Sequence, residues 1–199
     1  MTRYQSKHDT CLSIWADCYE AGRFDFPPDA HVLEIGCAEA DWQTPMLALR
    51  PDLHITGVDW RACKRPGTTI KGDILAVDFA PHTFDAVVGI SSIEHIGLGH
   101  YERDPAYVDG DRECMARVRE WLKPGGWAYL DVPYNVLGYA VEGTSHRVYD
   151  DAALRERLIP AGLVETARWY ADRSGTVVET LGPRRAGSYD YVALLLTKL

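Results

Sequence analysis

The chain has 199 residues, of which 46% are hydrophobic and 25% are charged, and its formal net charge is −8. This size and composition are typical of one globular domain, so we expect residues 1–199 to form a single domain. The acidic balance argues against nucleic acid as the main partner, because a face that binds phosphates needs an excess of basic residues. No stretch approaches the eighteen or so apolar residues of a membrane helix, so we expect no membrane partner.

The five cysteines are widely spaced and include no Cys-x-x-Cys pair. This pattern fits a reducing compartment and gives no sign of a disulfide framework. The first residues lack the apolar core of a secretory signal. We therefore expect a cytoplasmic protein, and the sequence leaves the oligomeric state open.

Predicted helices and short apolar strands alternate along the chain. Residues 9–19 carry an imperfect apolar stripe at helical spacing, and we expect residues 1–30 to pack on or cap the functional site. The other helices are predicted at 41–50, where Asp41 is a candidate cap, at 111–122 and at 150–160. The strands are predicted at 31–36, 53–58, 68–71, 84–90, 127–132, 163–170 and 191–197, with a turn at 123–126.

This alternation indicates an α/β fold with a mostly parallel sheet that is covered on both faces. Only a short loop region separates the last two strands, which favours an antiparallel pair at one edge. The predicted fold is therefore a seven-stranded, mostly parallel sheet with an antiparallel C-terminal edge pair.

In such a sheet, ligands bind beyond the carboxyl ends of the strands. The second strand ends in Asp59, which is well placed to bind the two hydroxyls of a ribose, as a carboxylate does in dinucleotide-binding folds. The sequence therefore predicts a cofactor that contains adenosine.

The first loop argues against a nicotinamide cofactor. Counted from Gly36, the dinucleotide fingerprint requires glycine at positions 38 and 41, where the chain has Ala38 and Asp41. A carboxylate at the start of a helix also repels a pyrophosphate. A sulfonium cofactor carries no phosphate and tolerates this loop.

Five segments stand in the order and spacing of one known family: VLEIGCAEA, ITGVDW, GDI, FDAVVGISSIEHIG and LKPGGWAYLDVP. On these segments the chain resembles the class I S-adenosylmethionine-dependent methyltransferases. The resemblance implies a Rossmann-like doubly wound fold, S-adenosyl-L-methionine (SAM) as cofactor and S-adenosyl-L-homocysteine (SAH) as product. The chain departs from the family in its first loop, where Gly36 is followed by Ala38 and Ala40 at positions that usually carry glycine.

The resemblance also implies roles for individual residues. Asp59 would hold the ribose hydroxyls, Trp60 would lie against the adenine, and Asp73 would accept a hydrogen bond from its exocyclic amine. The other residues assigned to cofactor binding lie at or beside the strand ends: Glu34, Gly36, Cys37, Ala38, Ile74 and Ser91.

The acceptor side needs groups that position a nucleophile and, for a hydroxyl, remove its proton. His95 is the favoured general base because it follows the fourth strand on the ligand side, and His146 and Glu94 are the other catalytic candidates. We expect O-methylation of a small-molecule or carbohydrate-like acceptor, because aromatic and polar residues flank His146 in the sequence. These flanking residues are Tyr134, Asn135, Tyr139 and Tyr149.

Two alternatives stay open. Some O-methyltransferases of the family carry E-x-x-E-H at this place and bind a divalent metal, which would here use Glu94 and His95. Because Ser91 replaces the first glutamate, we expect no metal ligands. The glycine-poor first loop also leaves room for a non-catalytic module that binds SAM or SAH.

Overall fold

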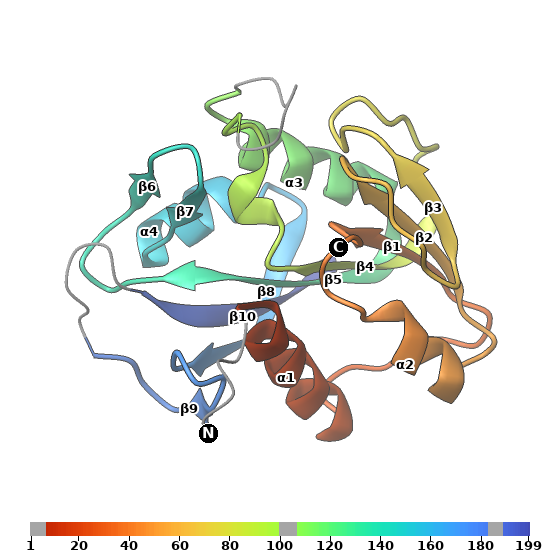
Figure 1. Cartoon of the computed structure of the whole chain (residues 1–199), viewed down its shortest axis with the longest axis horizontal. Helices are drawn as coiled ribbons and strands as arrows, with labels where there is room; N and C mark the ends of the chain where they lie inside the picture. The colour runs from red at the N-terminus through yellow and green to blue at the C-terminus, as the bar shows by residue number, and fades with distance from the viewer. Residues whose placement is uncertain (1–6, 100–106, 183–188) are drawn as a thin grey trace.

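The computed structural model describes residues 7–99, 107–182 and 189–199, and in this part of the chain the main sheet has eight strands (Figure 1). The strands are β1 (His31–Ile35), β2 (His54–Asp59), β3 (Thr68–Lys71), β4 (Phe84–Ile90), β5 (Leu122–Tyr134), β6 (Ala140–Glu142), β7 (His146–Val148), β8 (Leu163–Ala171), β9 (Val177–Val178) and β10 (Asp190–Lys198). The α-helices are α1 (Lys7–Glu20), α2 (Gln43–Leu49), α3 (Gly110–Trp121) and α4 (Asp151–Ala153). Two short segments are a 3₁₀-helix, η1 (Ile93–His95), and a π-helix, η2 (Leu154–Leu158).

The strand order in the sheet is β3-β2-β1-β4-β5-β10-β8-β9. Neighbouring strands from β3 to β5 are parallel, and β10 lies antiparallel between β5 and β8. This arrangement confirms the predicted α/β fold with a mostly parallel sheet and an antiparallel C-terminal pair. Among the eight described strands of the main sheet, the one absent from the prediction is β9, whose two residues are too few to show a period in the sequence.

One local prediction was wrong, and one local feature was missed. The segment predicted as a turn at 123–126 belongs to β5, and the pairing of β4 with β5 shifts register between Phe84 and Ala86 to admit it. Gly125, with φ of +76°, lies in this irregular part of the strand, so the glycine marks a distortion of β5 and not its beginning. The antiparallel hairpin β6–β7 was not predicted at all.

Helices cover both faces of the sheet: α1 and α2 lie on one side, and α3 and α4 lie on the other (Figure 1). Val32 and Leu33 are adjacent on β1 and fully buried, yet they belong to opposite hydrophobic clusters. Successive side chains of a strand point to opposite faces, so a strand that is buried on both faces is mostly apolar. This explains the apolar residues of β1 and β4, among which Glu34 is a buried exception.

Helix α1 contributes Cys11, Ile14, Trp15 and Cys18 to the core, all buried and at the spacing of one helical face. It packs against β4 and β10, so the described part of the N-terminal segment covers one face of the sheet. Residues 1–6 of this predicted segment lie outside the described residues. Within the described ranges, no helix has the length and apolar character needed to cross a bilayer.

A buried ionic cluster joins the β6–β7 hairpin to α3. Asp111 accepts hydrogen bonds from Arg157 Nη2 at 2.7 Å and from the Tyr149 hydroxyl at 2.9 Å. Arg147 is fully buried, lies 3.5 Å from Asp111, and donates to the carbonyls of Ile96 at 2.7 Å and Glu94 at 3.3 Å. The cluster therefore fixes the segment after β4, which bears His95, to the rest of the fold.

We predict that Asp111→Ala lowers the free energy of unfolding by about 3–5 kcal/mol, because it leaves buried arginine charge without its carboxylate. Urea denaturation measures the change. Asp109→Ala is the matched control: Asp109 also pairs with Arg157, but its side chain is 61% exposed, and we expect a loss of less than about 1 kcal/mol. Equal losses in the two variants would contradict the role given to the cluster.

Candidate functional site

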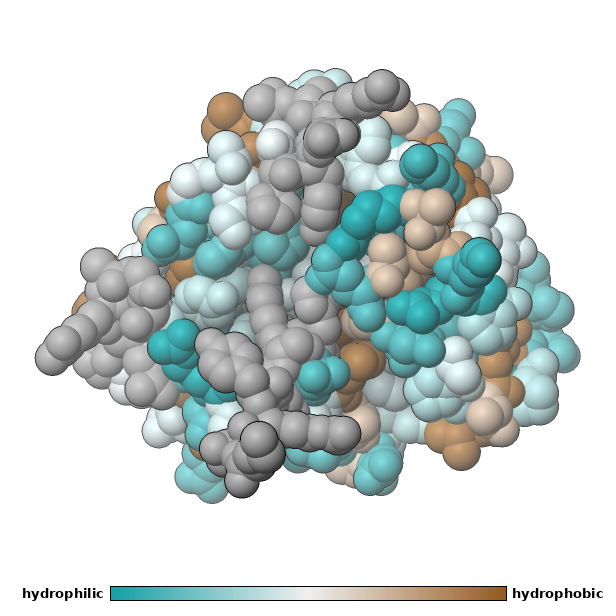
Figure 2. Space-filling model, viewed as in Figure 1, coloured by the Kyte–Doolittle hydropathy of each residue, from teal (hydrophilic) through white to brown (hydrophobic). Residues whose placement is uncertain are grey.

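A cavity that is partly open to solvent lies at the carboxyl ends of β1, β2 and β4. The cavity brings together six of the nine predicted cofactor residues, although these six are spread over positions 36 to 91 of the chain. Those that line it are Gly36, Asp59, Trp60, Asp73, Ile74 and Ser91. Figure 2 shows hydrophilic side chains gathered over β2 and β3 on the same face, so polar surface surrounds this part of the molecule.

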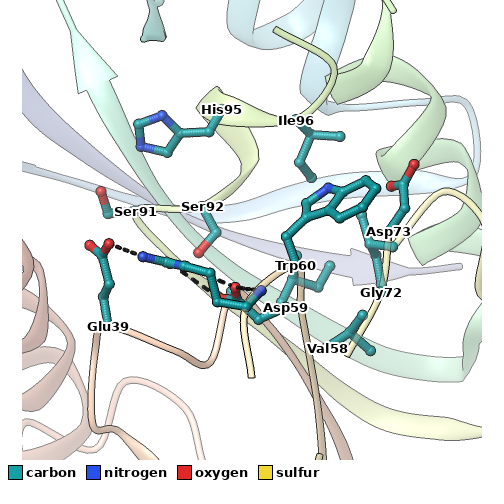
Figure 3. A pocket seen from close by; sticks show the side chains of 14 residues that line it. Glu39, Val58, Asp59, Trp60, Gly72, Asp73, Ser91, Ser92, His95 and Ile96 are labelled. Atoms are coloured by element: carbon teal, nitrogen blue, oxygen red, sulfur yellow. Dashed lines mark hydrogen bonds and ion pairs between the residues drawn. The ribbon is translucent and has the colours of Figure 1, made fainter. Parts of the chain in front are cut away.

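The cavity has two distinct ends. Trp60, Asp73 and Ile96 lie together at one end, while Ser91 and His95 lie at the other (Figure 3). One end therefore offers an aromatic ring beside a carboxylate, and the other offers a hydroxyl beside an imidazole.

Gly36 is required where β1 leaves the sheet. Its φ is +85°, and its N–H donates to the Val58 carbonyl at 2.8 Å. A Cβ at this position would lie 2.0 Å from Ser92 Oγ, so no other residue fits without moving the wall of the cavity. Ala38 and Ala40 are not among the described residues with positive φ, so this loop needs a left-handed backbone only at Gly36.

Ser91 occupies the left-handed region with φ of +46°, which is costly for a residue other than glycine. Two buried acids hold it there. Its N–H donates to Asp131 Oδ1 at 2.9 Å, and its hydroxyl donates to Glu94 Oε1 at 2.9 Å. The strained backbone at the end of β4 is therefore held by hydrogen bonds to side chains of β5 and η1.

The Asp59 carboxylate already accepts several hydrogen bonds. Oδ2 accepts from the Ala38 N–H at 3.0 Å, and Oδ1 accepts from the backbone N–H and Nε of Arg61 at 2.8 and 3.1 Å. The Arg61 guanidinium also pairs with Glu39 across the cavity (Figure 3). The Arg61 guanidinium therefore occupies positions at the Asp59 carboxylate that a ligand hydroxyl would need.

Asp73 begins the turn that follows β3. Its Oδ1 accepts from the Leu75 N–H at 2.8 Å, which fixes the carboxylate beside the Trp60 ring (Figure 3). This arrangement can accept a hydrogen bond from a flat, amine-bearing ring that lies against Trp60.

Three of the predicted cofactor residues, Glu34, Cys37 and Ala38, do not line the cavity. Glu34 accepts from Gln43 Nε2 at 2.6 Å, and Gln43 Oε1 accepts from the Gly67 N–H at 3.0 Å. Burial raises the pKa of Glu34 from 4.5 to about 7. Glu34 therefore stabilises the loops around the cavity through its contact with Gln43 of α2.

We predict that Glu34 makes stability depend on pH between about 4.5 and 7. Because its pKa in the folded protein is raised, the native state holds a proton that the unfolded state releases, so stability falls as pH rises through this range. Glu34→Gln removes this loss. Between pH 4.5 and pH 8, the free energy of unfolding of the variant should therefore rise by about 3 kcal/mol relative to that of the original protein. Urea denaturation at several pH values measures it, and parallel pH profiles for the two proteins would contradict the assignment.

Of the three catalytic candidates, one lines the cavity and two do not. His95 lines the cavity, its Nδ1–H donates to the Ser145 carbonyl, and its Nε2 lies 3.5 Å from Glu94 Oε1. With the Nδ1 proton committed to a carbonyl, Nε2 is the nitrogen able to accept a proton. Glu94 and His146 do not line the cavity, although the rings of His146 and His95 lie 6.2 Å apart.

Three of the four residues that flank His146 in the sequence are buried, and Asn135 is 8% exposed. Tyr134 is 3% exposed and Tyr149 is fully buried. Tyr139 is 38% exposed, but it does not line the cavity, and Arg157 lies over its ring at 5.1 Å. Within the described ranges, no group of three or more His, Cys, Asp or Glu side chains could hold a metal ion.

Sequence reasoning missed Glu39, Arg61, Ser92 and Ile96, which also line the cavity. Glu39 and Arg61 look like ordinary surface charges in the sequence, since their pairing spans two loops. Ser92 and Ile96 lie within the segment that carried the family resemblance, so their place after the fourth strand was the available signal.

Residues 73–182, more than half of the chain, match the model of a family described as "Caenorhabditis protein of unknown function, DUF268". No curated protein matches the chain.

Solved structures share the fold at low sequence identity. A 1,6-didemethyltoxoflavin-N1-methyltransferase from Burkholderia thailandensis, with 1,6-didemethyltoxoflavin and SAH bound, has a TM-score of 0.64 and 16% identity, covering 98% of this chain and 79% of that one. The N-methyltransferase NodS from Bradyrhizobium japonicum WM9, in complex with SAH, has a TM-score of 0.60 and 14% identity over 96% and 87% of the two chains. The [4+2]-cyclase SpnF has a TM-score of 0.61 and 15% identity over 96% and 80%.

The fold is therefore that of the class I SAM-dependent methyltransferases, which confirms the resemblance found in the sequence at the level of fold. Since a protein named as a cyclase shares this fold, the reaction must be argued from the site.

Proposed function

The chain belongs to the DUF268 family, and we propose that it is a SAM-dependent methyltransferase that acts on a small-molecule acceptor at oxygen. The observation that carries the proposal is one cavity that joins Asp59, Trp60 and Asp73 to Ser91 and His95. Carbohydrate-like compounds are one class of acceptor that offers the required hydroxyl.

The charges of the cavity support a sulfonium cofactor. Its walls contribute the carboxyl groups of Glu39, Asp59 and Asp73 and the guanidinium of Arg61. This excess of acid disfavours a pyrophosphate and favours a cofactor that carries positive charge and no phosphate. The residues fit SAM, which when bound supplies a methyl group for in-line transfer.

Each end of the cavity suits one part of SAM. Trp60 and Asp73 would hold the adenine, Asp59 would bind the ribose hydroxyls once Arg61 moves, and the backbone at Gly36 and Ser91 would face the methionine part. His95 then lies at the end where the acceptor must approach (Figure 3).

His95 is the proposed general base. The Ser145 carbonyl fixes its Nδ1–H, so Nε2 accepts the proton of the acceptor hydroxyl. Glu94 stabilises the resulting imidazolium because its Oε1 lies 3.5 Å from Nε2. A divalent metal at Glu94 and His95 is the weaker alternative, since the Glu94 carboxylate is turned to the Ser91 hydroxyl and does not line the cavity.

We predict that Asp59→Ala raises the dissociation constant for SAH by about 5- to 150-fold, which corresponds to about 1–3 kcal/mol for a lost charged acceptor. Isothermal titration calorimetry measures it. Asp78→Ala is the matched control, because Asp78 is exposed and lies outside the cavity in the segment after β3. An unchanged dissociation constant in Asp59→Ala would rule out the proposed ribose site, and no SAH binding by the unaltered protein would refute the function.

We predict that His95→Ala lowers turnover by about 10²- to 10⁴-fold, as expected for the loss of a general base, with little change in SAH affinity. Release of SAH from SAM, measured with a panel of hydroxyl-bearing acceptors, reports turnover. The matched control is His54→Ala, at the exposed start of β2. Equal turnover in the two variants would show that His95 is not the base. If the unaltered protein and both variants bind SAH but show no turnover, a non-catalytic module is favoured.

A further inference from the structure

Two free cysteines meet directly behind the cavity. Cys37 Sγ and Cys63 Sγ are 2.7 Å apart, although 26 positions separate them in the chain. Cys37 follows β1 and is fully buried, while Cys63 lies between β2 and β3 and is partly exposed. Gly57 on β2 makes room for this contact, since a Cβ there would lie 2.8 Å from the Cys37 sulfur.

The two thiols connect the loops that form opposite walls of the cavity. Gly36 and Glu39 lie beside Cys37, and Trp60 and Arg61 lie just before Cys63. The loops are otherwise joined by non-covalent contacts. Arg65 donates to the Cys37 carbonyl at 3.0 Å and to the Ala38 carbonyl at 3.2 Å. These contacts can break and re-form as the loops move.

We propose that Cys37 and Cys63 form a redox-modification site, at which hydrogen peroxide converts the two thiols to a disulfide that ties the walls of the cavity together. The formation of this bond stands on the thiol geometry alone. Its effect on ligand binding rests on the proposed function.

The chemistry begins at Cys63, because peroxide reaches the partly exposed sulfur first. The Cys63 sulfur attacks one peroxide oxygen, the O–O bond breaks, and Cys63 sulfenic acid and water form. The Cys37 sulfur then attacks the Cys63 sulfur, and the sulfenic hydroxyl leaves with the Cys37 proton as a second water. Two thiols and one peroxide thus give one disulfide and two waters.

Burial raises the pKa of the Cys37 thiol well above its ordinary value. Cys37 therefore stays protonated and resists direct oxidation by peroxide, which leaves Cys63 as the first sulfur to react. This division of roles fits a partly exposed sensing cysteine with a buried resolving cysteine.

The bond affects the site through Arg61, which is two residues before Cys63. The Arg61 guanidinium must leave Asp59 before a ribose can bind there. A disulfide at Cys63 limits the movement of this loop and holds Arg61 near Asp59. We therefore expect the oxidised protein to bind SAH with a dissociation constant at least about fivefold higher, and thiol reduction to restore the affinity.

The test treats the full chain with hydrogen peroxide and follows intact mass and peptides. We expect a loss of two hydrogen masses and, after non-reducing trypsin digestion, a link between peptides 24–61 and 62–64, which contain Cys37 and Cys63. We also expect slower cleavage after Lys64 in the native oxidised protein, since the bond suppresses local opening of the loop. Links through Cys11, Cys18 or Cys114, or no link at all, would overturn the proposal.

Cys63→Ser and Cys63→Ala are the controls, because a partly exposed position tolerates both substitutions. Peroxide should neither remove hydrogen mass from these variants nor change their SAH affinity. A linked protein that binds SAH as tightly as the reduced one would overturn the regulatory effect. If the reduced protein fails to bind SAH, the proposed function is refuted, while the linked peptide and the native cleavage rate still decide the thiol site.

Discussion

The site depends on the close contact between Gly36 and Ser92. Chain order in the sheet reverses between β1 and β4, so the segments that leave these two strands diverge and leave a crevice between them. Gly36 turns out of β1 with a left-handed backbone directly against Ser92, where no Cβ fits. The crevice keeps its shape because this turn and the strained Ser91 are fixed on either side of it.

Buried acids support these turns from behind. Asp131 and Glu94 hold Ser91, while Glu34 and its partner Gln43 brace the loops after β1 and β2. A buried carboxyl is costly unless it is hydrogen-bonded or protonated, and the raised pKa of Glu34 records that cost. Burying these acids thus costs stability, but their hydrogen bonds fix the residues that line the cavity.

The main sheet and part of the lining of the cavity follow from local sequence patterns. Apolar runs identify β1 and β4, and Asp59 and Asp73 follow strands whose ends must meet at one edge of a parallel sheet. The β6–β7 hairpin was missed because three-residue strands show no clear alternation. The pairing of Arg147 with Asp111 was missed because 36 positions separate the partners and neither residue has a local pattern that indicates burial.

Arg61 shows a further limit of sequence reasoning. Its position two residues after Asp59 is visible in the sequence, but its pairing with both Asp59 and Glu39 exists only when the two loops are folded together. The contact between Cys37 and Cys63 has the same origin, since 26 positions separate the two cysteines and no Cys-x-x-Cys pattern links them. Both features depend on how the loops around the cavity pack against one another.

A crystal structure determined with saturating SAH tests the central claim most directly. The account predicts a ribose whose two hydroxyls donate to Asp59, an adenine against Trp60, and an Arg61 side chain moved away from Asp59. A structure at saturating SAH in which Arg61 still pairs with Asp59 and no nucleoside occupies the cavity would contradict it.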